Sequence, residues 1–415
     1  MDFNLTEEQI MLQNIVKEFA HKEVSPFFQA LDRTPLPPPP KVLTQQIMKD
    51  RYPWKLWNKM HETGLCTLSI PQEYGGGGAS TLTQAIVCDE LGKAGGLNVI
   101  LQSTHEHLID EFGTDEQKRE FLTKCVEDPT YIISNATAEP EPTVEGKRPD
   151  DDSGVPVKTF AYLDGDEYVI NGFKRHVAIA PLAKLFIVWC RTDKDKPLSQ
   201  SLSGFLVPAD TPGVSLGEVL ETQVMMGRGG MNAEVIFENV RIPASYRLGP
   251  EGKMWDPRKK QFSFRDMLIL AGKTGSIQSV FDDVLEYARN KVQDGKVLIK
   301  HVNIGLRISD MLATLETAKL YYRKLASDWD NQHIEGTWNE NNLFLFRGFL
   351  ADMTTKFFLD GLEVLGATGL QKETPFHRHL FGHLSGGHGI GSSDNMRIRI
   401  MQWLADKSTI KYSSR

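Results

Sequence analysis

The stretches EYVINGFKRHVAIA (residues 167–180) and KLFIVWCRTD (residues 184–193) decide the fold, because their pattern differs from the helical sequence on either side. Both are rich in β-branched and aromatic residues and are bounded by turn residues, which is typical of strands. Similar short runs occur at YIISNATAEP (131–140), SGFLVPAD (203–210), GVSLGEVL (213–220) and AEVIFENVRIP (233–243). Their even spacing predicts a small β sandwich or barrel over residues 131–248.

Residues before and after this β segment carry apolar side chains at helical spacing. Residues 1–130 are predicted to be an all-helical domain, with helices near 5–30, 80–95, 97–113 and 115–126. Residues 249–415 are predicted to form a four-helix bundle from helices near 263–293, 298–329, 340–367 and 391–408. The expected fold class is therefore α+β, mostly α, with a helical domain, a small β domain and a helical bundle in that order.

Composition excludes several functional classes. The chain has 415 residues, of which 40% are hydrophobic and 24% charged, and a formal net charge of −7, which argues against a nucleic-acid partner. No apolar run approaches the roughly 20 residues that a membrane span needs. The four cysteines are scattered without CxxC pairing, and the acidic start MDFNLTEEQI lacks the pattern of a secretory leader. We therefore expect a cytoplasmic protein without a membrane partner.

Six strings occur in an order that resembles the acyl-CoA dehydrogenase family of flavoproteins over nearly the whole chain. They are FGTDEQKREFL (112–122), ATAEPEP (136–142), GDEYVINGFKRHV (165–177), GRGGMNAEVIFENVRIP (227–243), YARNKVQDGK (287–296) and EVLGATG (363–369). The resemblance implies FAD held between sheet and bundle and partly by a neighbouring subunit, a homotetramer built as a dimer of dimers, and an electron-transfer flavoprotein as acceptor. It also implies α,β-dehydrogenation of an acyl-CoA thioester, in which a base removes the α proton while a hydride leaves the β carbon.

The expected catalytic base is missing from its usual place. Most of the family carries a Glu just before the glycine turn that GSSDNMR (391–397) resembles, and Ile390 stands at that position. A minority carries the Glu on a bundle helix, and FRDMLILAG (264–272) offers Asp266 there. Asp266 is the leading candidate base, and the alternative is an ordinary surface carboxylate paired with Arg265.

Two other segments offer candidate bases. STHEH (103–107), which the resemblance implies lies near the acyl pocket, contains Glu106 between His105 and His107. Either the carboxylate or a flanking histidine is a candidate, and the alternative is a solvated face. His388 precedes the glycine turn and is a third candidate, although a histidine flanked by glycines also suits a structural hydrogen bond.

The resemblance also assigns ligand contacts, several of which are altered. Ala138 stands where the family has a flavin-contacting Thr, with Thr137 beside it, and His176 replaces an aromatic residue that stacks on the flavin ring. Lys291 and Glu363 replace an Arg and a Gln near the neighbouring FAD, and Asp294 replaces a Phe. The remaining implied cofactor contacts are Gly366, Ser392 and Asp394, and the implied substrate contacts are Ile390, Gly391, Arg397 and His105.

Four histidines, His377, His379, His383 and His388, lie close together in the sequence. The family pattern places them in a loop, and no carboxylate or cysteine nearby completes a metal site, so no metal is expected. The missing Glu leaves three functions open. They are an acyl-CoA dehydrogenase with a relocated base, acting on an unusual, cyclic or carboxylated acyl group, a related flavoenzyme with oxidase or reductase chemistry, and a non-catalytic subunit that completes the FAD site of a partner.

Overall fold

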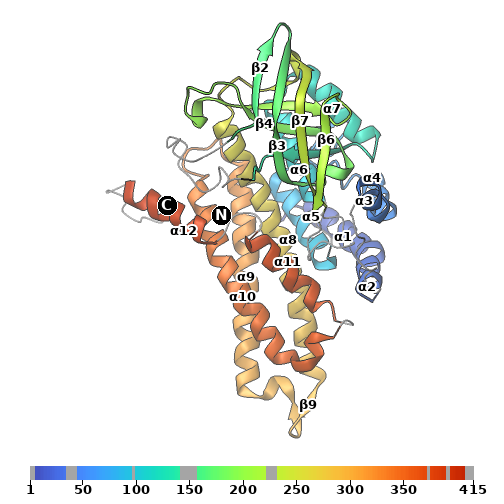
Figure 1. The fold of residues 1–415 in the computed structure, drawn as a ribbon. Coiled ribbons are helices and arrows are strands. Elements are labelled where there is room, and N and C mark those ends of the chain that lie inside the picture. The colour runs from blue at the N-terminus through green and yellow to red at the C-terminus, as the bar shows by residue number, and fades with distance from the viewer. Residues whose placement is uncertain are drawn as a thin grey trace. The chain divides into compact units, whose positions relative to one another are not determined.

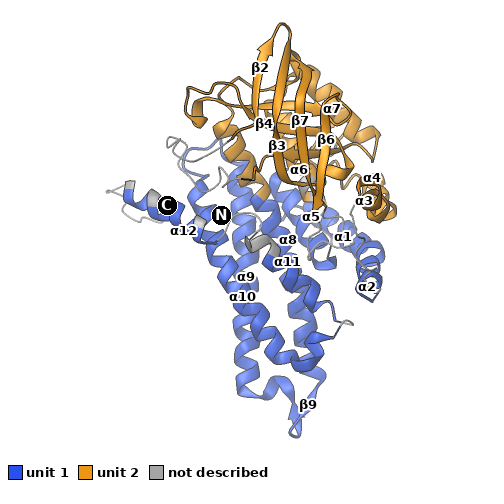
Figure 2. Cartoon of the chain, in the orientation of Figure 1, with its two compact units in different colours: residues 1–36, 80–97, 266–415 blue, residues 37–79, 98–265 orange. Residues whose placement is uncertain are grey.

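The computed structural model describes residues 5–33, 44–95, 99–140, 157–220, 231–371, 374–388 and 393–406. The expectation of a mostly helical α+β fold is confirmed, with strands confined to the predicted middle segment apart from one short hairpin (Figure 1). By packing, the chain divides into two compact units (Figure 2). One comprises residues 1–36, 80–97 and 266–415, and the other residues 37–79 and 98–265.

The second unit is built on a sheet of eight strands among its described residues, in the order β6-β7-β3-β2-β4-β5-β8, with β1 pairing with β4. The strands are β1 (Ile132–Ala136), β2 (Phe160–Asp164), β3 (Glu167–Ala178), β4 (Ala183–Arg191), β5 (Leu202–Pro208), β6 (Val214–Leu220), β7 (Asn232–Pro243) and β8 (Arg247–Leu248). Its helices are α3 (Gln45–Arg51), α4 (Trp54–Glu62), α6 (Val99–Phe112) and α7 (Asp115–Glu127).

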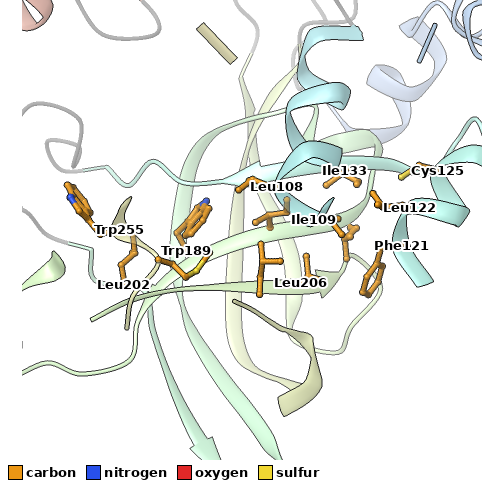
Figure 3. Packing of buried hydrophobic residues seen from close by; sticks show 14 of the residues in the cluster. Leu108, Ile109, Phe121, Leu122, Cys125, Ile133, Trp189, Leu202, Leu206 and Trp255 are labelled. Carbon is orange, nitrogen blue, oxygen red and sulfur yellow. The ribbon is translucent and has the colours of Figure 1, made fainter. Parts of the chain in front are cut away.

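Strand β4 is buried on both faces, which explains why its sequence is a continuous apolar run and not an alternating one. Leu185, Ile187 and Trp189 belong to one buried cluster, which also holds Leu108 and Ile109 of α6 and Phe121 and Leu122 of α7 (Figure 3). The intervening residues Phe186, Val188 and Cys190 belong to a second cluster made by the other strands. Successive side chains of a strand point to opposite faces, so a strand buried on both faces must be apolar throughout.

The first unit is helical. It contains α1 (Glu7–Phe19), a π-helical turn (Ala20–Val24), α2 (Ser25–Arg33), α5 (Thr81–Ala94), α9 (Val302–Asp330), α10 (Glu340–Leu365), α11 (Phe376–His388) and α12 (Ser393–Asp406). The long helix α8 (Trp255–Asn290) enters this unit at Asp266, and a hairpin of β9 (Val292–Gln293) and β10 (Lys296–Val297) follows it. Figure 1 shows α9 and α10 side by side.

Glycine fixes how α8 packs against α5. A Cβ atom added to Gly275 would lie 1.9 Å from the backbone oxygen of Asp89, and one added to Gly92 would lie 2.1 Å from that of Gly272. Backbone therefore meets backbone at this crossing, and no larger residue fits. The same α5 is tied to α9, because the backbone N–H groups of Thr81 and Leu82 donate to the Asp330 carboxylate at 2.8 and 2.9 Å.

The expectation that the histidine-rich segment is a loop is wrong. It forms α11, whose Phe376 packs edge-on against Phe358 in the bundle. Pro375 precedes the helix, where its missing N–H is harmless, and the apolar residues that follow recur at helical spacing. Among the described residues no helix combines the length and apolar character that spanning a bilayer requires.

Candidate active-site residues

Asp266 lies on α8 and is almost fully buried, so the alternative of an ordinary surface carboxylate is wrong. Arg347, on α10, donates from Nη1 to Oδ2 of Asp266, and the two side chains are 4% and 13% exposed. A buried carboxylate needs such a partner because an isolated charge in an apolar interior is costly. The bundle therefore carries a fixed, charge-compensated acid at the position that the sequence indicated.

A third charged residue, Lys273, shares the Asp266 face of α8 and was not singled out by the sequence analysis. It follows Asp266 by seven residues, which is two helical turns. Burial and the nearby Arg347 guanidinium lower the pKa of Lys273 to about 8, while the Asp266 carboxylate acts in the opposite direction. The helical spacing from Asp266 is the sequence signal that could have identified it.

Glu106 is fully buried on α6, so a solvated face is excluded for this residue. Its Oε2 accepts a hydrogen bond from Ser69 Oγ at 2.5 Å. Burial raises the pKa of Glu106 to about 8, although Ser69 and Gln102 partly oppose that shift. The Glu106 carboxyl therefore holds its proton at neutral pH and is poorly suited to accept another.

The two histidines beside Glu106 also have structural partners. His105 is buried, its Nδ1 lies 2.8 Å from the carbonyl oxygen of Ile133, and burial lowers its pKa to about 4. His107 stacks on Phe264 with ring centroids 4.0 Å apart, and its Nε2 lies 3.2 Å from Glu111 Oε2. Both rings therefore hold α6 against its surroundings.

A buried ion pair supports the segment that carries Thr137 and Ala138. Lys174, on β3, donates to Glu139 Oε1 at 2.8 Å and to the carbonyl oxygen of Thr137 at 3.3 Å. The next residue on β3, Arg175, donates its backbone N–H to the carbonyl oxygen of Ala138 at 2.8 Å. Thr137 and Ala138 are left half-buried on this rigid support, which fits a loop that contacts a flavin.

Glu139 is satisfied from several directions. It accepts hydrogen bonds from the backbone N–H of Lys158 at 2.7 Å and from Thr159 Oγ1 at 2.8 Å. Burial favours the neutral acid, but Lys174 and these donors together hold the pKa of Glu139 below its usual range. The pair is therefore an ion pair, and it is almost inaccessible to solvent.

Four further predicted cofactor residues are exposed, namely His176, Lys291, Glu363 and Gly366. His176 is exposed, with a φ of 55°, at an irregularity in the pairing of β3 with β7. Lys291, at the end of α8, and Glu363, on α10, are also exposed. Gly366 caps the C-terminus of α10 with a φ of 56°, and nothing lies within 4 Å of the position that a Cβ atom would take, which allows close approach of a ligand.

The aspartate at position 294 is explained by the local backbone conformation. It has a φ of 47° and Gly295 a φ of 76°, so the two form the tight turn between β9 and β10. Asp-Gly is the typical sequence for a two-residue hairpin turn of this kind. Asp294 therefore needs no ligand to explain it.

Ile390, Gly391 and Ser392 of the glycine turn lie outside the described residues, as does the side chain of His388 at the end of α11. Asp394 and Arg397 lie on α12 and are exposed. Arg397 donates to Asp394 Oδ1 at 3.1 Å and also pairs with Asp352 on α10. Their assignment to cofactor and substrate stays a prediction.

The α11 histidines have separate hydroxyl partners. His379 Nδ1 lies 2.6 Å from Ser276 Oγ on α8, and His383 Nδ1 lies 2.9 Å from Thr354 Oγ1 on α10. His377 Nδ1 lies 3.0 Å from the carbonyl oxygen of Thr374. Within the described ranges, no group of three or more His, Cys, Asp or Glu residues has the arrangement of a metal site.

Comparisons with known proteins agree with this architecture. Three family models match, namely the acyl-CoA dehydrogenase N-terminal domain at residues 6–128, the middle domain at 150–240 and the C-terminal domain at 255–405. A probable acyl-CoA dehydrogenase of Bacillus subtilis is 31% identical over 97% of this chain and 100% of its own length. A short-chain-specific acyl-CoA dehydrogenase of Clostridium acetobutylicum is 29% identical over 91% of this chain and 93% of its own.

Solved structures share the fold. Butyryl-CoA dehydrogenase from Megasphaera elsdenii superposes with a TM-score of 0.82 at 24% identity, covering 98% of this chain and 100% of that one. The chain therefore belongs to the acyl-CoA dehydrogenase family of FAD-dependent oxidoreductases.

Proposed function

We propose that the enzyme catalyses α,β-dehydrogenation of an acyl-CoA thioester, with Asp266 as the base that removes the α proton. One observation carries the proposal: Asp266 is a buried carboxylate on a bundle helix, in a chain that has Ile390 at the usual base position. FAD, when bound, supplies the acceptor for the hydride that leaves the β carbon. The side chain of Asp266 supplies the oxygen that takes the proton.

Arg347 has a defined part in this scheme. Its guanidinium balances the negative charge of Asp266 and fixes the direction of the carboxylate through the hydrogen bond to Oδ2. Orientation matters because proton transfer requires the acceptor within hydrogen-bond distance of the proton. Aspartate is one methylene shorter than glutamate, so the acyl group must lie closer to α8 than a glutamate would require.

Glu106 is the weaker candidate base. Its raised pKa, about 8, leaves it protonated at neutral pH, and its buried carboxyl is held by Ser69. We assign it to packing in the second unit. His388 stays a third candidate.

We propose that Thr137, Ala138, Gly366 and Lys291 contact FAD. The first two lie on the support made by Lys174 and Glu139, Gly366 leaves room for a close approach, and Lys291 offers an exposed positive charge for phosphate. Four other residues stay predicted contacts with FAD, namely His176, Glu363, Ser392 and Asp394.

We further propose a homotetramer. Large apolar side chains are exposed on neighbouring helices of the first unit, with Val302 and Leu306 on α9 at 77% and 64% and Leu359 on α10 at 60%. Such residues favour burial against another copy of the chain. Sedimentation of the holoprotein should give the tetramer mass, and a monomer at micromolar concentration would contradict the proposal. An electron-transfer flavoprotein as acceptor and a cytoplasmic location stay predictions.

The proposed reaction is tested by mixing the yellow holoprotein with a panel of acyl-CoA thioesters under anaerobic conditions. A substrate should bleach the visible absorbance of the flavin by an amount that depends on its acyl group, and the product should be the 2-enoyl thioester. Retention of FAD without bleaching by any thioester would favour the non-catalytic subunit. Flavin reduction by an unrelated donor alone would favour the oxidase or reductase alternative.

A further inference from the structure

The hydroxyl group of Thr137 belongs to a chain of hydrogen bonds inside the second unit. Trp189, on β4, donates from Nε1 to Oδ1 of Asn135, on β1, at 2.7 Å. Thr137 Oγ1 donates to the same oxygen at 2.9 Å, and Asn135 Nδ2 donates to Gln261 Oε1 at 3.4 Å. Trp189 and Gln261 are both buried, and Trp189 lies in the apolar cluster of Figure 3. Buried side chains therefore hold Asn135 from two sides.

The indole group of Trp189 determines which way the hydrogens of this network point. An indole N–H can only donate, so the carboxamide atom of Asn135 that it contacts must be the oxygen. That oxygen carries no proton, so the Thr137 hydroxyl group must direct its own hydrogen towards it. The hydroxyl hydrogen is thus used inside the protein, and Thr137 Oγ1 offers only lone pairs to a ligand.

Thr137 Oγ1 is the side-chain acceptor that this part of the loop offers. The carbonyl oxygen of Thr137 already accepts a hydrogen bond from Lys174. That of Ala138 accepts one from the backbone N–H of Arg175, and alanine has no polar side-chain atom. In the part of the chain that the structure describes, no residue donates to Thr137 Oγ1. Because Thr137 is half-buried, a donor on a bound molecule would complete its hydrogen bonding.

We propose that Thr137 accepts a hydrogen bond from a ring N–H group of FAD, and that Asn135 is the positioning residue that makes the hydroxyl group an acceptor. This inference rests on the proposed contact between Thr137 and FAD. The flavin ring has two nitrogens that can donate. N3 carries a proton in both oxidation states, whereas N5 carries one only in the reduced ring, and hydrogen bonds to ring nitrogens tune a flavin.

The test compares the wild-type holoprotein with Thr137→Val, which lacks the hydroxyl group. The Kd of oxidised FAD is measured from the fluorescence of flavin released on dilution, and the midpoint potential from anaerobic reduction beside a reference dye. A bond from N3–H predicts a Kd about 3- to 10-fold higher in the variant, with an unchanged potential. A bond from N5–H predicts an unchanged Kd and a lower potential, by about 30 mV for a tenfold loss of affinity for reduced FAD.

Two control variants separate the hydroxyl group from packing. Thr137→Ser keeps the hydroxyl group and should retain the wild-type Kd and potential. Thr130→Val is the matched control, because Thr130 Oγ1 also donates to the side chain two residues earlier, Asp128 Oδ1, at 2.7 Å. Thr130 precedes β1 whereas Thr137 follows it, so Thr130→Val should change neither quantity.

Asn135→Leu tests the positioning role, because it frees the Thr137 hydroxyl group to rotate. The variant should shift the same quantity as Thr137→Val and in the same direction. The double variant should match Thr137→Val alone, because both substitutions act on one hydrogen bond. Additive effects would show that Asn135 does not act through Thr137.

The result in Thr137→Val decides the proposal even if Asn135→Leu does not fold. An unchanged Kd together with an unchanged potential would overturn it, and so would a loss that Thr137→Ser does not restore. Failure of the proposed reaction is a separate result, because neither measurement uses a thioester.

Discussion

Arg347 on α10 donates directly to the carboxylate of Asp266 on α8, and this buried ion pair joins the two helices within the first unit. An ion pair that is removed from water makes the protein sensitive to substitution of either member. Loss of one member leaves the other charge buried without compensation, which costs more than the pair itself contributes.

The Arg347→Met variant should therefore lose about 3–5 kcal/mol of unfolding free energy, because the Asp266 carboxylate would lose the guanidinium while it stays buried. Urea unfolding of the holoprotein measures the loss. A matched control is Arg397→Met, which breaks a pair with Asp352 whose side chains are 51% and 57% exposed. That variant should lose less than about 1 kcal/mol. Equal losses in the two variants would contradict the account of Asp266 as a buried, compensated anion.

The Lys174→Met variant should bind FAD more weakly. Glu139 would lose its cation and the carbonyl oxygen of Thr137 would lose a donor, so the loop would no longer be fixed. The FAD content after gel filtration and the fluorescence of released flavin measure the effect. Arg241→Met removes an exposed ion pair from β7 of the same sheet and should retain full FAD content. Full retention in Lys174→Met would show that the ion pair does not position the loop.

Glu106 predicts a pH dependence of stability. Its pKa is about 8 in the folded protein and 4.5 is its ordinary value, so between these values the unfolded chain releases a proton that the folded chain keeps. Stability should fall as pH rises through this range and level off above it, by about 1.4 kcal/mol per pH unit at most. Glu106→Gln removes this term, so its advantage in Tm over the wild type should grow from pH 5 to pH 8. A constant difference would contradict the assignment.

The Gly275→Ala variant should lose several kcal/mol of stability, because the new Cβ would lie 1.9 Å from the Asp89 carbonyl oxygen and α8 would be forced away from α5. Gly382→Ala provides the control. Gly382 is also helical, on α11, and nothing lies within 4 Å of the Cβ position. That change should be neutral or stabilise by up to about 1 kcal/mol. Similar Tm values for both variants would show that the crossing is not set by glycine.

Much of the fold could be predicted because local patterns and tertiary burial agree. The continuous apolar run of β4 and the helical spacing of α8, α9 and α10 each follow from the side of the element that is buried. The helix α11 was missed because the family pattern placed this segment in a loop, whereas contacts such as Phe376 on Phe358 stabilise a helix there. Those contacts involve residues far apart in the sequence.

The candidate site was only partly predictable. Asp266 stood at a position that the family resemblance indicated, but its partner Arg347 is 81 residues away, and only packing joins them. Lys273 was within reach of the periodicity argument, because it lies two helical turns after Asp266, but its burial and the nearby Arg347 guanidinium follow only from packing. The pKa of Glu106 depends on complete burial, which no local pattern predicts.

The central claim is that Asp266 removes the α proton. The most direct measurement is the rate of anaerobic flavin bleaching by a reactive acyl-CoA in Asp266→Asn, with FAD content and thioester binding measured in the same samples. The account predicts a fall of several orders of magnitude with FAD and thioester still bound, and partial recovery in Asp266→Glu. Bleaching at the wild-type rate in the fully loaded Asp266→Asn variant would contradict it.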